Sequence, residues 1–567
     1  MQSIVYNGTK GARPMKKIPY GISDFRSVLA EDFYYIDKTS FIEKLENYGR
    51  FLYLIRPRRF GKSLFVNMLD FYYNVRWEKD WELLKGNYIY EHPTKERHSY
   101  HVLKFDFSAV STKGSVDDNF SKECNITMDY FLKSNNINLT IDIENQAHDN
   151  LKLIFTHLKQ TTPNIKIYIL IDEYDNFINN LLVNDKQEYE RLTSSTEAVY
   201  KEFFKLLKAL TNENNSPLKR MFFTGVSPLA LFDVTSGSNI GKNITNEFMF
   251  NDAVGVTQEN LDDMFSYYKL DKDYFSLMQE WYNNYKFNKN VKHTIYNTDM
   301  AIYFIDHLIH SQTPPDNLVD INVRTDYGKL KYLVHANNKL NGNFNALKTL
   351  FTKGFLTIDV IKDSFSAIEL TKQENFISLL YYLGLVTIDK STIQGVSLKI
   401  PNQTISQIMA EFVKVMLEDT NTYSIDLQKF HQMTVDLAIN NSLEVFKYIA
   451  DELDNNTSIR DLVNQESDIK MFYMVYFTLN RVYTPISELE LNKGYADILL
   501  TKTPYIKEDI PNILIEFKFF KQSEKPNIDE AVNKAKEQII QYKQSKKIRV
   551  DKSVIVVFHG FKMVYCK

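Results

Sequence analysis

Four short apolar runs, separated by stretches of helix length, constrain the fold of this chain more than any other feature. The runs are RFLYLI (50–55), HVLKFDF (101–107), KIYILID (166–172) and RMFFTGV (220–226). Short, nearly continuous apolar runs are typical of strands that are buried on both faces of a parallel sheet. With helical patterns between them, they predict an α/β layered domain over residues 18–255.

The remainder of the chain divides into three further predicted segments. Residues 1–17 form a basic leader, and 256–430 are mainly helical, ending in a hairpin-like stretch at 396–402. Within 431–567, a helical stretch precedes the apolar runs ADILLT, NILIEFKFF and SVIVVFH, and a lysine-rich helix lies between the last two. This pattern predicts a second, smaller α/β domain at the C-terminus. The mainly helical region 256–430 is expected to act as a lid and linker.

Composition excludes several classes of protein. The chain has 567 residues and only two cysteines, Cys124 and Cys566, which rules out a disulfide framework or a zinc–cysteine cluster. The first residues contain no apolar signal-peptide core, and no apolar run is long enough to span a bilayer. We therefore expect a cytoplasmic protein with no membrane partner. The net charge of −3 means that any surface for nucleic acid must be local.

A phosphate-binding loop is indicated by Gly61-Lys62-Ser63, which stand between the first apolar run and a helical stretch. In such a loop, backbone N–H groups and a helix N-terminus converge on the anion. The lysine reaches the β- and γ-phosphates, and the hydroxyl holds Mg²⁺. The alternative is a helix start that contains this tripeptide by accident.

The beginning of this loop departs from the standard pattern G-x-x-x-x-G-K-[ST]. The first glycine would fall at position 56, where this chain has Arg56 followed by Pro57. The backbone must therefore leave the strand by a different turn. Arg58 and Arg59 are expected to add positive charge to the phosphate cradle.

Acidic and polar residues at the ends of two later strands support the nucleotide reading. Asp172 and Glu173 follow the third apolar run, where a phosphoryl-transfer site requires an acid that holds Mg²⁺ and a base that polarises the attacking water. Thr224, at the end of the fourth run, is positioned to sense the γ-phosphate. The alternative is a strand that ends in an ordinary polar turn.

A second set of charged residues lies near the C-terminus. Glu516 and Lys518 alternate with apolar residues in LIEFKFF, so a strand places both side chains on one face, and Asp497 belongs to a preceding strand. Two carboxylates on adjacent strands can hold a divalent cation. The cation activates water for phosphodiester cleavage while the lysine orients that water or neutralises charge. An acid-x-Lys pair on an exposed strand also occurs by chance.

The stretches that begin at Pro19 (PYGISDFRSVLAEDFYYIDKTSFIEKL), together with RPRRFGKSLFVNML, ILIDEYDNFI and FFTGVSP, resemble the AAA-ATPase-like proteins of bacteria that carry a PD-(D/E)XK nuclease-like C-terminus. The resemblance covers nearly all of the chain beyond residue 16. It implies that Arg-Pro-Arg-Arg-Phe-Gly-Lys-Ser is the usual loop of this family. It also implies roles in nucleotide binding and turnover for Lys62, Ser63, Asp172 and Glu173.

At the C-terminus, two stretches flank the pair Glu516 and Lys518: Gly-Tyr-Ala-Asp, which ends at Asp497, precedes it, and AKEQIIQY follows it. This order resembles the PD-(D/E)XK arrangement of two strands followed by a helix. In that helix Gln538 and Tyr542 are four residues apart, so they share a face and are expected to support the metal site. Glu466, on an upstream helix, is a further candidate metal ligand, with a solvated helix acid as the equal alternative.

The expected function is an ATPase coupled to a metal-dependent nuclease. The expected cofactors are ATP and Mg²⁺ or Mn²⁺. The expected partner is a nucleic acid, with DNA favoured over RNA. A homo-oligomer is an open option. The rival reading is a nucleotide-gated switch or interaction protein, whose nuclease-like domain binds DNA or a partner without cleaving. A role in defence or mobile-element biology rests on analogy between folds.

Overall fold

The computed structural model describes residues 15–567 except 196, 214, 236–239, 321–334, 337–338, 341, 420–423, 456–462, 492–493, 505, 546 and 548. The predicted leader therefore lies, as far as residue 14, outside the described residues. The chain divides into two compact units. The first runs to Phe275 and includes Asn290–Leu318, and the second comprises Ser276–Lys289 and Val319–Lys567.

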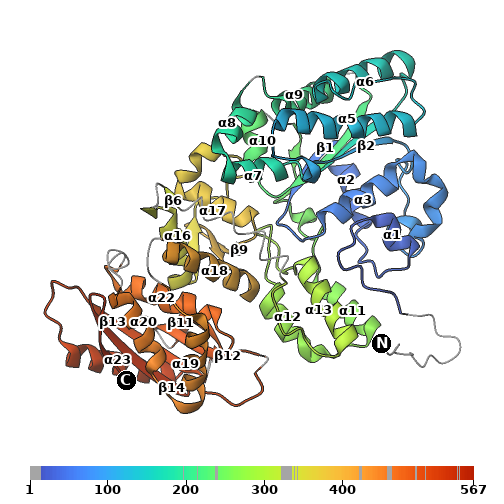
Figure 1. Cartoon of the computed structure of the whole chain (residues 1–567). Helices are drawn as coiled ribbons and strands as arrows, with labels where there is room; N and C mark the ends of the chain where they lie inside the picture. The colour runs from blue at the N-terminus through green and yellow to red at the C-terminus, as the bar shows by residue number, and fades with distance from the viewer. Residues whose placement is uncertain are drawn as a thin grey trace. The chain divides into compact units, whose positions relative to one another are not determined.

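The first unit is built from strands and helices that alternate along the chain (Figure 1). In chain order they are α1 (Phe25–Ala30), α2 (Ser40–Tyr48), β1 (Phe51–Ile55), α3 (Lys62–Tyr73), α4 (Tyr88–Glu91), β2 (His101–Asp106), α5 (Val116–Ser134), α6 (Ala147–Thr161), β3 (Ile167–Asp172), α7 (Asn176–Asn184), α8 (Lys186–Ser194), α9 (Val199–Asn212), β4 (Leu218–Gly225), α10 (Leu229–Thr235), β5 (Lys242–Asn243), α11 (Gln258–Tyr268) and α13 (Thr298–Ser311). Short 3-10 helices lie at Val75–Leu84, Phe107–Ala109, Phe248–Phe250 and Lys272–Tyr274.

The five strands form one parallel sheet in the order β2-β3-β4-β1-β5. The predicted α/β fold class is confirmed, and each of the four apolar runs supplies one of the strands β1 to β4. All six residues of β3 are buried, as expected for a strand covered on both faces. Helix α3 packs against β2, β3 and β4, whereas α5 contacts β2 and α9 contacts β4. Because the strands are parallel, their carboxyl ends meet at one edge of the sheet.

The second unit begins with a mainly helical part. Its elements are α12 (Phe275–Tyr282, whose first residue closes the first unit), β6 (His335–Ala336), β7 (Lys339–Leu340), α16 (Asn343–Lys353), β8 (Phe355–Ile358), a 3-10 helix (Ala367–Thr371), α17 (Gln373–Tyr382), β9 (Thr387–Thr392), β10 (Gly395–Lys399) and α18 (Gln403–Asp419). Strands β8, β10 and β9 form an antiparallel sheet, so the predicted hairpin-like stretch is the central strand of three. The predicted segment 256–430 is thus shared between the units, and its boundaries stay a prediction.

The C-terminal part of this unit is a mixed five-stranded sheet with helices. Its elements are α19 (Leu427–Asn440), α20 (Glu444–Asn455), α22 (Glu466–Leu479), β11 (Tyr483–Leu491), β12 (Gly494–Lys502), β13 (Ile513–Phe520), α23 (Ile528–Lys543), β14 (Lys552–His559) and β15 (Lys562–Cys566), with the strands in sequential order across the sheet. Only β13 and β14 are parallel, and α23 is the crossover between them. Its apolar face covers β12, β13 and β14 in one buried cluster.

None of the helices within the described residues is both long and apolar enough to cross a membrane.

Candidate functional site

The connection between β1 and α3 forms a tight loop over residues 56–61. Gly61 has φ +90° and Arg59 has φ +70°, so two residues in the left-handed region bend the chain back before α3 starts. Glycine takes this conformation without strain, which explains its place directly before Lys62. No side chain caps α3, so its first N–H groups face the loop as an anion site requires.

Arg56 takes the place of the missing glycine and has a structural role. Its side chain is fully buried, and its guanidinium donates to the carbonyl oxygens of Ile55 at 3.0 Å, Thr245 at 2.6 Å and Phe250 at 3.0 Å. The backbone N–H of Arg56 also donates to Gly225 O at the end of β4, at 3.2 Å. The loop therefore starts from a fixed point at the sheet edge, although it lacks the standard glycine.

The two following arginines are held by neighbouring segments of the first unit. Arg58 donates to Asn176 Oδ1 of α7 at 3.3 Å, and Arg59 forms an ion pair of 3.1 Å with Asp299. The start of α13 also contacts the loop backbone, since Thr298 Oγ1 donates to Phe60 O at 2.9 Å. The side chains of Arg58 and Arg59 are half-buried at the loop, and the contacts from α13 were not anticipated from the sequence.

Lys62, Ser63, Asp172 and Glu173 come together at the carboxyl edge of the sheet. Lys62 is buried and its Nζ donates to Pro57 O at 3.0 Å, while Ser63 is hydrogen-bonded to the Asp172 side chain. Burial lowers the pKa of Lys62, and the charges of Glu173 and Asp172 oppose that shift. Burial also raises the pKa of both acids. The sequence pattern thus brings the expected four side chains to one place.

Thr224 and Asp175 organise the neighbouring strand ends. Thr224 is buried and its hydroxyl donates to Leu54 O at 2.7 Å, so its proton is engaged within the sheet. Asp175, which the sequence reasoning passed over, is also buried and accepts from the N–H groups of Val226 and Ser227. It therefore ties the turn after β3 to the turn after β4. The sequence signal that could have identified Asp175 is its position, three residues after Asp172.

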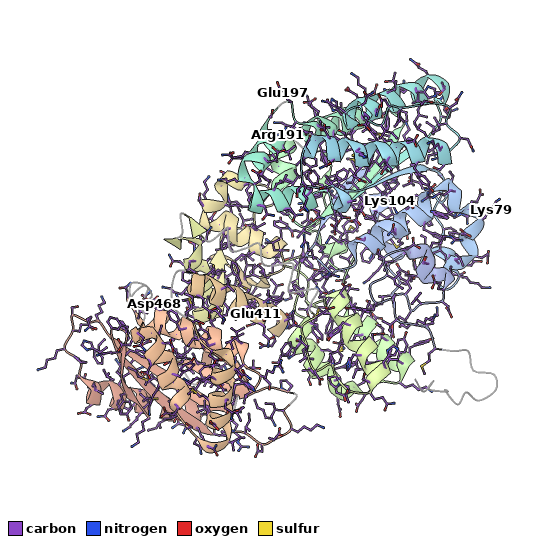
Figure 2. The ribbon with its side chains drawn as sticks, in the orientation of Figure 1. Lys79, Lys104, Arg191, Glu197, Glu411 and Asp468 are labelled. Atoms are coloured by element: carbon purple, nitrogen blue, oxygen red, sulfur yellow. The ribbon has the colours of Figure 1, made fainter. Side chains whose placement is uncertain are left out.

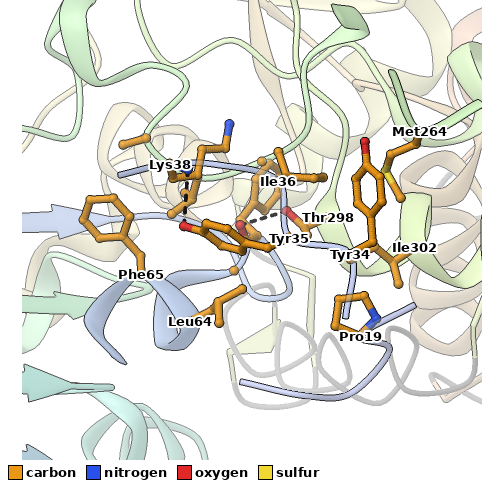
Figure 3. Close-up of a pocket in the computed structure, with 15 residues that line it drawn as sticks. Pro19, Tyr34, Tyr35, Ile36, Lys38, Leu64, Phe65, Met264, Thr298 and Ile302 are labelled. Carbon is orange, nitrogen blue, oxygen red and sulfur yellow. Dashed lines mark hydrogen bonds between the residues drawn. The ribbon is translucent and has the colours of Figure 1, made fainter. Parts of the chain in front are cut away.

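A pocket opens beside the phosphate loop and encloses about 520 Å³, part of it open to solvent (Figure 3). It is lined mainly by apolar and aromatic side chains from the segment 19–38, from α3 and from α11 and α13. Tyr35 OH accepts from Lys38 N at 3.2 Å, and Gly61 of the loop belongs to the same wall. Burial lowers the pKa of Lys38 to about 8. Its mainly apolar and aromatic lining is typical of sites for small ligands.

In the second unit, Asp497, Glu516 and Lys518 lie together on adjacent strands. The register of β12 and β13 pairs Ile498 with Ile515, which sets Asp497 opposite Glu516. Lys518 Nζ lies 3.2 Å from Glu516 Oε2, as the predicted same-face arrangement requires. Asp497 Oδ2 accepts from Phe517 N at 2.8 Å, so the acid is tied to the neighbouring strand.

Lys470 and Glu488 join this site, and sequence reasoning missed both. Lys470 of α22 is buried and lies 2.9 Å from Asp497 Oδ1, and it also forms an ion pair with Glu488. Glu488 interrupts the pairing of β11 with β12 at the level of Asp497 and has φ +49°. The register is the same on both sides of Glu488, so its positive φ alone departs from regular strand geometry. No sequence signal marks it.

The supporting residues lie around the same carboxylates. Glu466 opens α22, and burial, followed by the charge of Asp497, raises its pKa to about 7. Gln538 is hydrogen-bonded to Tyr542, whose hydroxyl donates to Tyr495 O at 3.0 Å. Burial and then the charge of Glu516 raise the pKa of Tyr542 to about 12. The structure therefore brings every C-terminal residue of the sequence prediction to one region.

The donor atoms of both sites fit a hard divalent cation. The first offers the Ser63 hydroxyl and the Asp172 carboxylate, which are the oxygen ligands that Mg²⁺ prefers. In the second, Glu516 is buried, and its Oε1 has no hydrogen-bond partner among the described residues. Within those residues, no three acidic, histidine or cysteine side chains converge as a complete ligand set. Two lysines, Lys470 and Lys518, are paired with carboxylates of the second site.

Two comparisons with protein families agree with this geometry. Residues 19–235 match the family model described as "Predicted AAA-ATPase", and residues 464–567 match the PD-(D/E)XK nuclease superfamily. The first match contains the loop with Asp172 and Glu173, and the second contains all residues of the C-terminal site. The resemblance seen in the sequence is confirmed for both segments, which together support an ATPase–nuclease fusion.

The chain is also similar to a curated protein of Azotobacter chroococcum mcd 1, described as "Uncharacterized protein in vnfD 5'region". The two are 25% identical over 275 residues, which is 48% of this chain and 48% of the relative. The chain thus spans about half the length of the curated relative it matches.

Proposed function

We propose that the first unit binds and hydrolyses ATP with Mg²⁺. We also propose that the second unit cleaves nucleic acid with Mg²⁺ or Mn²⁺, and we favour DNA over RNA as its substrate. The observation that carries the proposal is the pairing of a lysine with two carboxylates at each of two separate sheets. Lys62 lies with Asp172 and Glu173 on one, and Lys518 lies with Asp497 and Glu516 on the other. The nucleotide would control cleavage through the predicted lid and linker.

In the first site, the N–H groups at the start of α3 bind the phosphates, and Lys62 exchanges Pro57 O for a phosphate oxygen. Ser63 and Asp172 would hold the cation, which neutralises charge that develops on the phosphates. Glu173 acts as general base for water, and its raised pKa suits that task. Arg58 and Arg59 add positive charge, Thr224 supports the loop from the next strand, and the adjoining pocket accepts the base.

In the second site, Asp497 and Glu516 would hold the cation, with Glu466 as a further ligand. The bound cation polarises the phosphodiester and activates water. Lys518 lies beside Glu516 and is placed to orient that water or to neutralise the developing negative charge. Gln538 and Tyr542 support the site from α23.

The first test is Lys62→Ala in the full chain, measured as ATP binding by calorimetry and as phosphate release. We expect both to be lost, because the phosphates lose their lysine. Lys79→Ala, which changes an exposed lysine of the same unit, is the matched control and should behave as wild type. Normal ATP turnover in Lys62→Ala would overturn the loop assignment.

The second test compares wild type with Lys518→Ala on several DNA and RNA substrates, with and without ATP and with Mg²⁺ or Mn²⁺. We expect ATPase activity to persist in the variant and cleavage to fall at least 100-fold. Lys521→Ala, three residues further on and exposed, is the control that should still cleave. Equal cleavage by wild type and Lys518→Ala would refute the nuclease site.

One observation favours the non-catalytic alternative, a nucleotide-gated switch that binds DNA or a partner. Both carboxylate oxygens of Asp497 already have partners, Lys470 and Phe517 N. A titration of DNA binding with Mg²⁺ or Mn²⁺, in wild type and in Asp497→Ala, separates the readings. If DNA binding is independent of the metal and unchanged in the variant, while no cleavage occurs, the alternative holds.

The wider setting belongs to the same proposal. We place the activity in the bacterial cytoplasm and in defence or mobile-element biology, on the strength of analogy between such fusions alone. A homo-oligomer would let a neighbouring subunit supply an arginine to the ATP site. Light scattering with and without ATP tests this: a protein that stays monomeric under both conditions excludes it.

A further inference from the structure

A buried lysine stands where a divalent cation would meet Asp497. Lys470 is only 4% exposed, and its Nζ lies 2.9 Å from Asp497 Oδ1 and in an ion pair with Glu488. A buried ammonium is tolerated only when its charge is paired, so this contact is strong. The other oxygen of Asp497 accepts from the backbone N–H of Phe517. The ammonium beside Oδ1 repels a divalent cation that approaches the same carboxylate.

Lys470 is held in this place by a fixed helix. At the start of α22, Asp468, which is labelled in Figure 2, accepts from the N–H groups of Asn464 and Gln465. It also forms a 2.6 Å ion pair with Lys348 of α16. Asp468 and Lys470 are both at most 4% exposed. The helix therefore presents Lys470 to β12 from a rigid support. Glu488 of β11 supplies a second partner for the ammonium, through an ion pair.

The charges of the site leave room for a divalent ion. Four carboxylates and two lysines influence one another there, namely Glu466, Glu488, Asp497 and Glu516 with Lys470 and Lys518. If all are ionised, four negative charges against two positive charges leave two negative charges. Glu516 Oε1 is the open oxygen among the described residues. A cation can therefore bind Glu516 directly, whereas the charge of Lys470 opposes its approach to Asp497.

We propose that Lys470 is an internal cation of the nuclease-like site, which competes with the divalent metal for Asp497. When the metal binds, Lys470 gives up Asp497 and stays paired with Glu488 alone. Lys470 is thus a positioning residue that weakens metal binding and sets the metal concentration at which the site fills. This inference rests on the metal site assigned to the second unit under the proposed function.

The test measures Mn²⁺ binding to the full chain by calorimetry, without nucleotide or nucleic acid. Asp497→Asn identifies the heat that belongs to the second unit. We expect Lys470→Met to bind Mn²⁺ at this site at least 10-fold more tightly than wild type. Lys414→Met is the matched control, because it also removes a lysine of the same unit that is paired with a carboxylate, Glu418, and neither residue belongs to the proposed site. It should leave the Mn²⁺ affinity unchanged.

A second variant keeps the inference falsifiable if Lys470→Met fails to fold, as judged by circular dichroism. Lys470→Arg retains the charge and can bridge two carboxylates more firmly, so it should bind Mn²⁺ more weakly than wild type. Unchanged or weaker binding by folded Lys470→Met, or tighter binding by Lys470→Arg, overturns the inference while leaving the metal site intact. If neither wild type nor any variant binds Mn²⁺ at Asp497, the proposed metal site falls as well.

Discussion

Single side chains decide how both sites are built, and Arg56 shows this most clearly. A standard phosphate loop has glycine at this position, whereas here an arginine is buried and donates to three carbonyl oxygens. Two of these acceptors belong to Thr245 and Phe250, which are distant in sequence. The arginine thus replaces a flexible turn by a fixed attachment, and the loop needs that attachment to keep Gly61 and Lys62 in place.

Restoring the standard motif with Arg56→Gly should therefore damage the protein. The substitution leaves buried carbonyl oxygens without donors and adds a flexible residue, so we expect the free energy of unfolding to fall by about 3–5 kcal/mol. ATP binding should weaken as well. Urea unfolding and calorimetry measure both effects, and Arg50→Gly, at the exposed start of β1, is the control with a small effect. A stable Arg56→Gly protein with improved ATP affinity would contradict this account.

At the scale of elements, close packing between helices and strands positions the second site. Helix α22 supplies Lys470 and Glu466, β12 and β13 supply the two strand acids, and α23 supplies Gln538 and Tyr542. Gly494 allows α23 to approach β12, because a Cβ atom there would lie 2.7 Å from Cε1 of Tyr542. The Gly-Tyr-Ala-Asp stretch therefore has a steric reason for its glycine.

Gly494→Ala should push Tyr542 away from β12 and destabilise the second unit by about 1–3 kcal/mol, the usual cost of overpacking. Metal binding should weaken along with it, because the support from α23 is displaced. Thermal unfolding provides the measurement. Gly342→Ala, where an added Cβ meets nothing within 4 Å, is the control. In the double variant with Tyr542→Ala, most of the loss should disappear, and strictly additive losses would count against the steric explanation.

At the scale of the whole molecule, each of the two units contains one of the proposed sites. Unfolding of such a chain is expected in more than one step. The ionisation of the second site also links its stability to pH. Burial raises the pKa of Glu516 and brings that of Glu466 to about 7, above the ordinary value of 4.5. The folded state therefore binds more protons than the unfolded state between pH 4.5 and about 7.

It follows that these acids contribute stability that is complete below pH 4.5 and is lost as pH rises through about 7 for Glu466 and about 8 for Glu516. Mn²⁺ requires the ionised acids, so it should raise the melting temperature of the second unit by about 3 °C or more at pH 8 and by much less at pH 5.5. Differential scanning calorimetry resolves the transition. Glu516→Gln should remove the Mn²⁺ effect, and an equal shift at both pH values would contradict the linkage.

Much of the fold was readable from local patterns. Short apolar runs predicted β1 to β4, and the alternation in LIEFKFF predicted that Glu516 and Lys518 share a face, because these features depend on residues close in the chain. The strands β5, β11 and β15 were not predicted, since they are short or only partly buried. The residues proposed for the two sites could be chosen from the sequence, because their spacing relative to the apolar runs is typical of phosphate-binding and metal-binding residues.

The sequence by itself determined which side chains gather at the two proposed sites, since loop spacing and strand alternation are local properties. Only the tertiary structure decided what surrounds them: the carbonyl oxygens that hold Arg56, and the lysine that pairs with both Asp497 and Glu488. Such contacts join residues that are far apart in the chain, and the positive φ of Glu488 follows no periodic pattern. The periodicity of the sequence therefore carries no information about these contacts.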